Sequence, residues 1–211
     1  MIRLALTTGR IEQKAVDIFK KAGYDCTELE NKGRKLFFKI SDGVEVVLAK
    51  ANDVITYVEH GVCDMGVVGK DTIMEMDAHV YEVMDLGFGK CRFALACKKG
   101  TDFFSGYSHK IIASKYPNVT KEYFRSLGLD VEVVKIDGSV ELAPLLGLSD
   151  GIVDIVETGS TLKENGLEVI RDVAPISARL IVNTASIKLK KSETDAVIDA
   201  VSLICKSENL I

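Results

Sequence analysis

The sequence lacks the patterns from which disulfide frameworks, metal sites and membrane spans are built. Its 211 residues include 5 cysteines and 3 histidines. The cysteine count is odd and no two cysteines form a C-x-x-C pair, so we expect reduced, buried thiols. His60, His79 and His109 lack the spacing of metal ligands, which indicates surface or packing roles. No apolar run approaches the about 20 residues of a bilayer-spanning helix, so no contact with a membrane is expected.

An excess of positive charge is also absent. Lysine and arginine total 27 against 31 acidic residues, which gives a formal net charge of -4. Because nucleic-acid binders normally carry a basic face, nucleic acid is not an expected partner. A small anionic ligand is compatible with this charge if cations and backbone N–H groups gather around it locally. The apolar start of the chain, residues 2–6, is too short for a secretory signal, so we expect a cytoplasmic protein.

Short β-branched runs alternate with amphipathic stretches, which is typical of an α/β protein with mostly parallel sheets. Polar residues at helix starts, among them Asn52, Asp53, Thr120 and Ser139, are expected to act as N-caps. The expected strands are residues 2–7, 36–40, 44–49, 65–68, 93–97, 110–114, 131–136, 151–156 and 180–183. The expected helices are residues 11–22, 52–60, 71 onwards, 120–127, 140–148, 161–165 and 192–203.

The segment Gly87-Phe88-Gly89 marks a change in the character of the sequence and predicts a hinge. We expect a first α/β lobe from residues 1–88 together with 179–211, and a second lobe from residues 89–178. We expect the last segment to return to the first lobe, because a chain that crosses twice between two lobes makes a natural hinged cleft.

A strand followed by a hydroxyl-rich turn is the strongest local signal in the sequence. The apolar run Ile152–Val156 leads through an acidic residue into Thr158-Gly159-Ser160-Thr161, which opens a short helix. Such a turn gathers backbone N–H groups and hydroxyls at a helix N-terminus, an arrangement that suits a phosphate monoester. Asp154 and Glu157 could hold ribose hydroxyls or a Mg²⁺-bound water. The alternative is a plain strand-to-helix turn in which Thr and Ser only cap the helix.

Longer segments carry a wider resemblance. The main run is DGSVELAPLLGLSDGIVD (137–154), continued by ETGSTL (157–162) and NGL (165–167), and it resembles the signature of the ATP phosphoribosyltransferase family. The segments TGR (8–10), NDV (52–54), DMGVVGKD (64–71) and GKCR (89–92) are similar to the same family. The resemblance covers nearly the whole chain in order.

This resemblance implies a two-lobed fold similar to type II periplasmic binding proteins, with both substrates in the cleft. The implied reaction is attack of adenine N1 of ATP on the anomeric carbon of phosphoribosyl pyrophosphate (PRPP), the first step of histidine biosynthesis, with Mg²⁺ as cofactor. The chain matches the short form of the family, which lacks a C-terminal regulatory domain. Short-form chains work in a mixed oligomer with a regulatory subunit that resembles histidyl-tRNA synthetase.

The resemblance also implies two sets of binding residues. The residues implied for PRPP are Glu141, Asp154, Glu157, Thr158, Gly159, Ser160, Thr161 and Leu162. The residues implied for ATP are Gly9, Arg10, Lys50, Gly69, Lys70, Asp71 and Arg92. No acid or base is assigned, because N1 has no proton to lose, and Mg²⁺ is expected on the pyrophosphate of PRPP without a firm protein ligand. Two positions depart from the family: Thr8 stands where lysine is common, and 50–52 lack the usual arginines.

Other interpretations stay open at this stage. The cations Arg34 and Lys90, like those in the ATP set, also fit solvated surface charges. Glu141 also fits simple stabilisation of a helix start. A phosphoribosyltransferase for a different base would share the phosphate-binding turn. A two-lobed solute-binding module without catalytic activity would share the fold.

Overall fold

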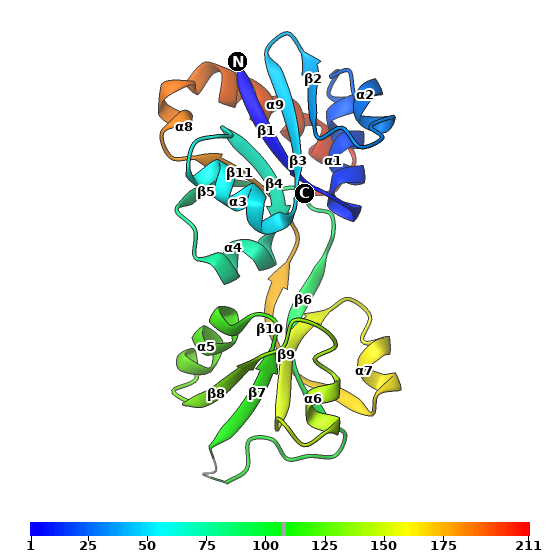
Figure 1. Ribbon diagram of the computed structural model, residues 1–211, viewed down its shortest axis with the longest axis vertical. Helices are drawn as coiled ribbons and strands as arrows, with labels where there is room; N and C mark the ends of the chain where they lie inside the picture. The colour runs from blue at the N-terminus through cyan, green and yellow to red at the C-terminus, as the bar shows by residue number, and fades with distance from the viewer. Residues whose placement is uncertain (107–108) are drawn as a thin grey trace. The chain divides into compact units, whose positions relative to one another are not determined.

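The computed structural model describes residues 1–106 and 109–211 (Figure 1). The chain divides into two compact units: unit 1 is Met1–Gly89 with Ser177–Ile211, and unit 2 is Lys90–Ile176. These boundaries lie within two residues of those expected from the Gly87-Phe88-Gly89 hinge. Each unit contains its own sheet and its own helices.

Unit 1 is built on a six-stranded sheet with the order β2-β3-β1-β4-β11-β5. Strands β3, β1 and β4 are parallel, whereas β2, β11 and β5 join the sheet by antiparallel pairing. The bounds of these strands are β1 (Ile2–Thr7), β2 (Phe37–Ser41), β3 (Val44–Ala49), β4 (Met65–Gly69), β5 (Val80–Asp85) and β11 (Ala178–Asn183).

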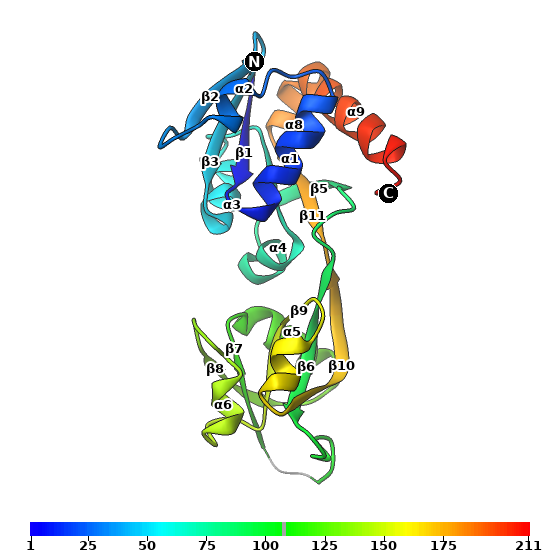
Figure 2. The ribbon, with the colours of Figure 1, turned by 90° about the vertical axis from the view of Figure 1, so that its right-hand side faces the viewer.

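Helices cover both faces of this sheet. Helices α1 (Arg10–Lys21) and α9 (Lys191–Ser207) pack on one face, and α3 (Ala51–Glu59) and α4 (Lys70–Met76) on the other (Figure 2). The alternation of side chains along β1 explains this arrangement, because Leu4 and Leu6 point to the α1 face and Ala5 to the α3 face. Two short helices, α2 (Thr27–Glu30) and α8 (Ser186–Leu189), complete the unit.

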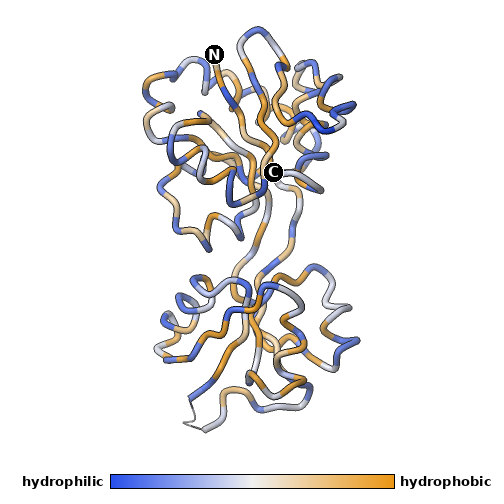
Figure 3. Tube along the Cα trace, viewed as in Figure 1, coloured by the Kyte–Doolittle hydropathy of each residue, from blue (hydrophilic) through white to orange (hydrophobic). Residues whose placement is uncertain are grey.

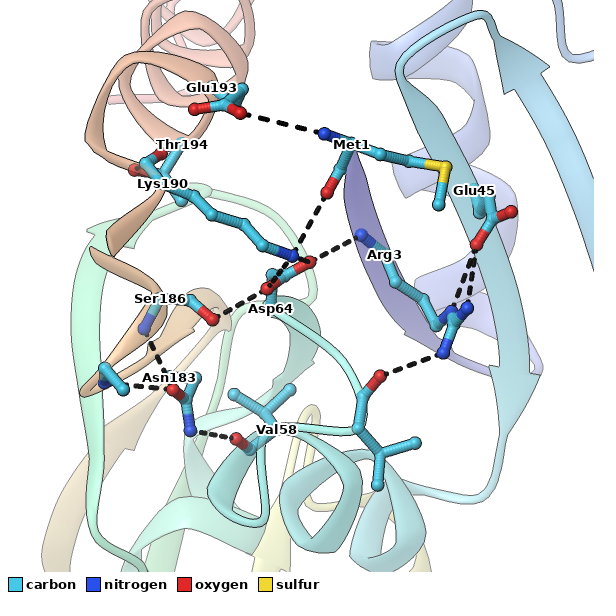
Figure 4. Close-up of polar contacts among 12 residues, drawn as sticks. Met1, Arg3, Glu45, Val58, Asp64, Asn183, Ser186, Lys190, Glu193 and Thr194 are labelled. Carbon is cyan, nitrogen blue, oxygen red and sulfur yellow. Dashed lines mark hydrogen bonds and ion pairs between the residues drawn. The ribbon is translucent and has the colours of Figure 1, made fainter. Parts of the chain in front are cut away.

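Within unit 1, a buried aspartate holds the C-terminal segment, Ser177–Ile211, against the N-terminal part of the unit (Figure 4). Asp64, which precedes β4, accepts hydrogen bonds from the backbone N–H of Arg3 at 2.9 Å and from the Ser186 hydroxyl at 2.7 Å. The Lys190 ammonium lies 2.8 and 2.9 Å from its two carboxylate oxygens. Burial acts to raise the pKa of Asp64, but the hydrogen bonds from Lys190, Ser186 and Arg3 outweigh it and hold that pKa below its ordinary value.

Unit 2 is built on a five-stranded sheet with the order β10-β6-β9-β7-β8. Strands β9, β7 and β8 are parallel, and β6 and β10 run antiparallel to their neighbours. The strands are β6 (Cys91–Lys98), β7 (Lys110–Ser114), β8 (Val131–Lys135), β9 (Gly151–Val156) and β10 (Leu167–Ile176). The helices are α5 (Pro117–Ser126), α6 (Leu142–Leu145) and α7 (Ser160–Glu164).

Both sheets are mixed, so the expectation of mostly parallel sheets is wrong in that respect. In unit 1 the Ser41–Gly43 turn is too short for a crossover, and β2 and β3 therefore form an antiparallel hairpin. Strand β10 was missed because charges and Pro175 interrupt its apolar pattern; such a strand is tolerated at the sheet edge, where β10 lies. Strand β5, the edge strand of unit 1, was missed as well.

Three expected helix starts also differ from the structure. Lys50, not Asn52 or Asp53, is the N-cap of α3. Helix α5 begins at Pro117, so Thr120 lies inside it and donates its hydroxyl to the Tyr116 carbonyl at 2.8 Å. The helix expected at 140–148 is limited to α6, because Pro144 has no N–H for the Val140 carbonyl and Gly147, with φ of 75°, ends the helix.

Apolar residues concentrate along the strands of each unit (Figure 3), and the interior positions of β1, β6 and β9 are almost fully buried. Among the described residues, no helix combines the length and the apolar composition that crossing a bilayer requires.

Candidate functional site

The parallel strands of unit 2 end together at one edge of the sheet. In the register of the sheet, Ser114 of β7 is paired with Val153 of β9 on one side and with Lys135 of β8 on the other. The segments that follow these three strands therefore lie side by side, at the carboxyl end, where α/β sheets bind ligands. They contain the hydroxyl-rich loop 157–161 after β9, residues 115–116 after β7, and residues 136–141 after β8.

The loop after β9 presents its hydroxyls to solvent. Thr158, Ser160 and Thr161 are all exposed, and the Thr158 and Ser160 hydroxyl oxygens lie 3.1 Å apart. Between them Gly159 adopts a left-handed conformation with φ of 80°, which glycine reaches without the strain of other residues. The N-cap of α7 is Gly159, which has no side chain, and the Thr158 hydroxyl accepts the N–H of Ser160 at 3.4 Å.

Leu162 differs from the other residues of the loop. Its side chain is buried with Val156 and Ile152 in the core of unit 2. Only the backbone of Leu162 can therefore face a ligand, and its side chain fixes the start of α7 against the sheet.

Two carboxylates and a lysine meet beside this loop. Burial raises the pKa of the half-buried Asp154, the N–H of Ile155 lowers it, the charge of Glu141 raises it again, and the Lys115 ammonium lowers it. Glu141 and Lys115 are thus both close enough to act on the Asp154 carboxylate. Lys115 was not among the predicted site residues; the available signal was its position directly after the strand expected at 110–114.

The predicted ATP residues of unit 1 gather at a corresponding edge. Thr7 at the end of β1 is level with Ala49 at the end of β3, and Leu6 is level with Val67 of β4. The three neighbouring parallel strands thus lead directly into Gly9-Arg10, Lys50 and Gly69–Asp71. Arg10 and Lys50 are exposed at this edge.

Local contacts hold two of these segments in place. The N–H of Gly9 donates to the buried carboxylate of Glu12 at 3.2 Å, which fixes the start of α1. A Cβ built on Gly69 would lie 2.0 Å from the Asp71 carboxylate oxygen, so a larger residue here would displace the Asp71 side chain. The Asp71 carboxylate therefore folds back over the start of α4.

Lys70 and Arg92 are engaged in ion pairs. The Lys70 ammonium pairs with Glu82, which also accepts a bond from Arg179 at 2.9 Å. Arg92 lies in unit 2, where the strand register pairs it with Val156 at the end of β9. Its guanidinium forms an ion pair with Asp172 at 2.6 Å. The structure therefore brings Gly9, Arg10, Lys50 and the 69–71 segment to one edge of unit 1, and places Arg92 near the end of β9 in unit 2.

The described residues contain no group of three or more His, Cys, Asp or Glu side chains arranged to hold a metal ion. The 5 cysteines are free thiols, and burial raises the pKa of Cys26 and Cys63 to about 11 each, so neither is a reactive thiolate at neutral pH. The arrangement offers hydroxyls, N–H groups and cations for anionic ligands.

Comparison with known proteins identifies the family. The model of the ATP phosphoribosyltransferase (HisG) family matches residues 50–202. An ATP phosphoribosyltransferase of Clostridium kluyveri is 61% identical over 203 residues, which cover 96% of this chain and 93% of that protein. The structure of the ATP phosphoribosyl transferase (HisG:HisZ) complex from Thermotoga maritima is 33% identical, with a TM-score of 0.84 and 99% coverage of both chains.

A more distant structure shares the fold alone. The periplasmic aliphatic sulphonate binding protein SsuA of Escherichia coli is 12% identical, with a TM-score of 0.60, and the match covers 99% of this chain and 74% of that one. The expected likeness to periplasmic binding proteins is therefore confirmed at the level of the fold. The chain itself belongs to the ATP phosphoribosyltransferase family.

Proposed function

We propose that this chain joins ATP to PRPP. Adenine N1 attacks the anomeric carbon of PRPP, the bond to the pyrophosphate oxygen breaks, and the products are phosphoribosyl-ATP and pyrophosphate, the first step of histidine biosynthesis. The observation that carries the proposal is the 61% identity to an ATP phosphoribosyltransferase over 96% of the chain.

PRPP is assigned to unit 2. The exposed hydroxyls of Thr158, Ser160 and Thr161 and the backbone N–H groups around Gly159 would hold the 5-phosphate. Asp154 lies at the end of β9 beside this loop, where its carboxylate would accept hydrogen bonds from ribose hydroxyls. Glu141 and Glu157 belong to the same edge, and Leu162 contributes through its backbone.

ATP is assigned to unit 1. The exposed Arg10 and Lys50 follow adjacent parallel strands and would bind phosphate oxygens of the nucleotide. Gly9 and the 69–71 segment complete this edge. Lys70 already forms an ion pair with Glu82. It would therefore bind ATP either by leaving Glu82 or by contacting Glu82 and ATP together. Arg92 belongs to unit 2, and its place in the ATP set rests on the family resemblance alone.

The chemistry needs position and charge more than proton transfer. N1 offers a lone pair and has no proton to lose, so bond formation requires no general base. The transition state has oxocarbenium character at the anomeric carbon, as in other reactions at that centre. The protein groups would orient the two substrates and stabilise the negative charge of the departing pyrophosphate.

Magnesium is the proposed cofactor. We assign the ion mainly to phosphate oxygens of the substrate and to water, because Mg²⁺ usually keeps several waters and binds through substrate phosphates with one or two carboxylates, and Asp154 and Glu141 lie at this edge. When bound, Mg²⁺ would neutralise charge on the pyrophosphate.

A regulatory partner is also proposed. The Thermotoga maritima structure is a complex of HisG with HisZ. The structural match covers 99% of this chain and 99% of the matched chain. We assign to this chain the same kind of mixed oligomer, with a HisZ-type subunit that resembles histidyl-tRNA synthetase.

The test is pyrophosphate release by the chain mixed with a HisZ-type subunit and Mg²⁺. Release is expected only when ATP and PRPP are both present, and the product should carry the ribose on N1 of the nucleotide. Release with a free purine or pyrimidine in place of ATP would identify a different phosphoribosyltransferase. Binding of PRPP without release under any of these conditions would support a solute-binding module.

A further inference from the structure

The turn after β7 holds an exposed lysine in a fixed position. Ser114, the last residue of β7, is fully buried, and its hydroxyl donates to the Val153 carbonyl of β9 at 2.6 Å. The same oxygen accepts the N–H of Tyr116 at 2.9 Å. Lys115 lies between these two anchored residues and is exposed. The buried hydrogen bonds therefore fix the backbone on both sides of Lys115.

The neighbouring elements restrain the turn further. The Ser114 carbonyl accepts the N–H of Ile136 at 3.1 Å, which ties the turn to the segment after β8. The Tyr116 carbonyl accepts the N–H of Thr120 at 3.0 Å in the first turn of α5. The ring of Tyr116 packs against Phe93 of β6, with ring centroids 4.8 Å apart. A lysine on such a support loses little backbone freedom when it binds a ligand.

The register of β7 and β9 places Lys115 beside Asp154. Ser114, the last residue of β7, is paired with Val153 of β9, so Lys115 directly follows the residue whose partner precedes Asp154. Lys115 is exposed, Asp154 is half-buried, and the charge of the Lys115 ammonium acts on the Asp154 carboxylate. Glu141 acts on the same carboxylate, so the lysine stands among negative charges at the edge that carries the hydroxyl loop.

PRPP is strongly anionic, whereas Asp154 and Glu141 make this edge acidic. A cation beside them is needed to bring the phosphate oxygens of PRPP to the same place. We propose that Lys115 is a PRPP-binding residue, whose ammonium donates to a phosphate oxygen of PRPP next to Asp154. This inference rests on the proposed function, since it assumes that unit 2 binds PRPP.

The experiment measures ligand affinity and turnover for Lys115→Met and Lys115→Arg in the complex with the HisZ-type subunit. Lys115→Met keeps the aliphatic stem and removes the charge, so the Kd and KM for PRPP should rise about tenfold. The Kd for ATP should stay within twofold, and Lys115→Arg should restore part of the PRPP affinity. The matched control is Lys121→Met, an exposed lysine of α5 in the same unit, which should bind PRPP like the wild type.

Two probes identify the oxygen that Lys115 contacts. Ribose 5-phosphate and inorganic pyrophosphate are titrated separately against wild type and Lys115→Met. Weaker binding of ribose 5-phosphate assigns the lysine to the 5-phosphate, and weaker binding of pyrophosphate assigns it to the leaving group.

Unchanged PRPP affinity in a folded Lys115→Met variant would overturn the inference. Equal weakening of ATP and PRPP, with a lower melting temperature, would overturn it as well, because it would make Lys115 a structural residue. The proposed function fails separately, through absence of turnover in the wild-type complex, so the two outcomes are distinguishable.

Discussion

Three exposed hydroxyl side chains, Thr158, Ser160 and Thr161, lie within four residues at the end of β9. Their exposure separates them from residues that stabilise the fold, because removing an exposed hydroxyl leaves no buried group without a partner. The side chain of Leu162, the next residue, is instead buried in the core of unit 2. The loop therefore combines a ligand-facing part and an anchored part within one short sequence.

The double variant Thr158→Ala/Thr161→Ala should weaken PRPP binding at least about tenfold, since it removes two hydroxyl donors from the phosphate loop. Its melting temperature should match that of the wild type. Calorimetric titration with PRPP and with ATP checks both expectations, and Thr101→Ala, an exposed threonine elsewhere in unit 2, is the control. Normal PRPP affinity in the stable double variant would remove this loop from the site.

Arg10→Ala should mainly weaken ATP binding. Arg10 is exposed at the first position of α1, where β1 ends, and we expect the KM for ATP to rise about tenfold with little change for PRPP. Lys14→Ala, an exposed residue of the same helix, should leave both constants unchanged. If Arg10→Ala instead lowers the melting temperature and affects both substrates, the residue is structural.

At the scale of elements, the returning segment of unit 1 depends on one buried carboxylate. Asp64 binds β1 through the Arg3 N–H, α8 through the Ser186 hydroxyl, and the start of α9 through Lys190. Asp64→Asn removes the ion pair with Lys190, which is partly exposed, so we expect a loss of about 2 kcal/mol in the free energy of unfolding. Asp42→Asn, in an exposed turn, should cost far less.

The effect of Asp64 should depend on pH with a defined sign. Its pKa is lowered in the folded state, so its contribution is complete above the unfolded-state pKa of about 3.9 and is lost as the pH falls through the folded-state pKa. Urea unfolding of wild type and Asp64→Asn should therefore differ fully at pH 7 and converge below about pH 4. A difference that stays constant down to pH 3 would mean that the carboxylate charge is not the stabilising feature.

Most elements of this fold follow from sequence pattern. The β1 and β9 strands are mostly apolar, each with a single charged residue, Arg3 in β1 and Asp154 in β9, and their bounds match the expected ones. The elements that were missed owe their structure to tertiary context. Strand β10 pairs with β6 despite its charges and Pro175, and Thr120 looks like a cap but lies inside α5 because Pro117 starts that helix.

At the scale of the molecule, both units repeat one design. Each contains three neighbouring parallel strands whose carboxyl ends lead into loops with cations or hydroxyls. The sequence predicts the loops individually, and the family resemblance names their ligands. It does not predict that the turn after β7 lies next to Asp154, because that juxtaposition depends on the pairing of Ser114 with Val153, 39 residues apart in the chain.

The decisive measurement is formation of phosphoribosyl-ATP from ATP, PRPP and Mg²⁺, followed by absorbance with and without a HisZ-type subunit. We expect turnover that requires the subunit or rises when it is added. Absence of turnover in both cases, with the subunit shown to be bound, would contradict the proposal that ATP is the acceptor of the ribosyl group.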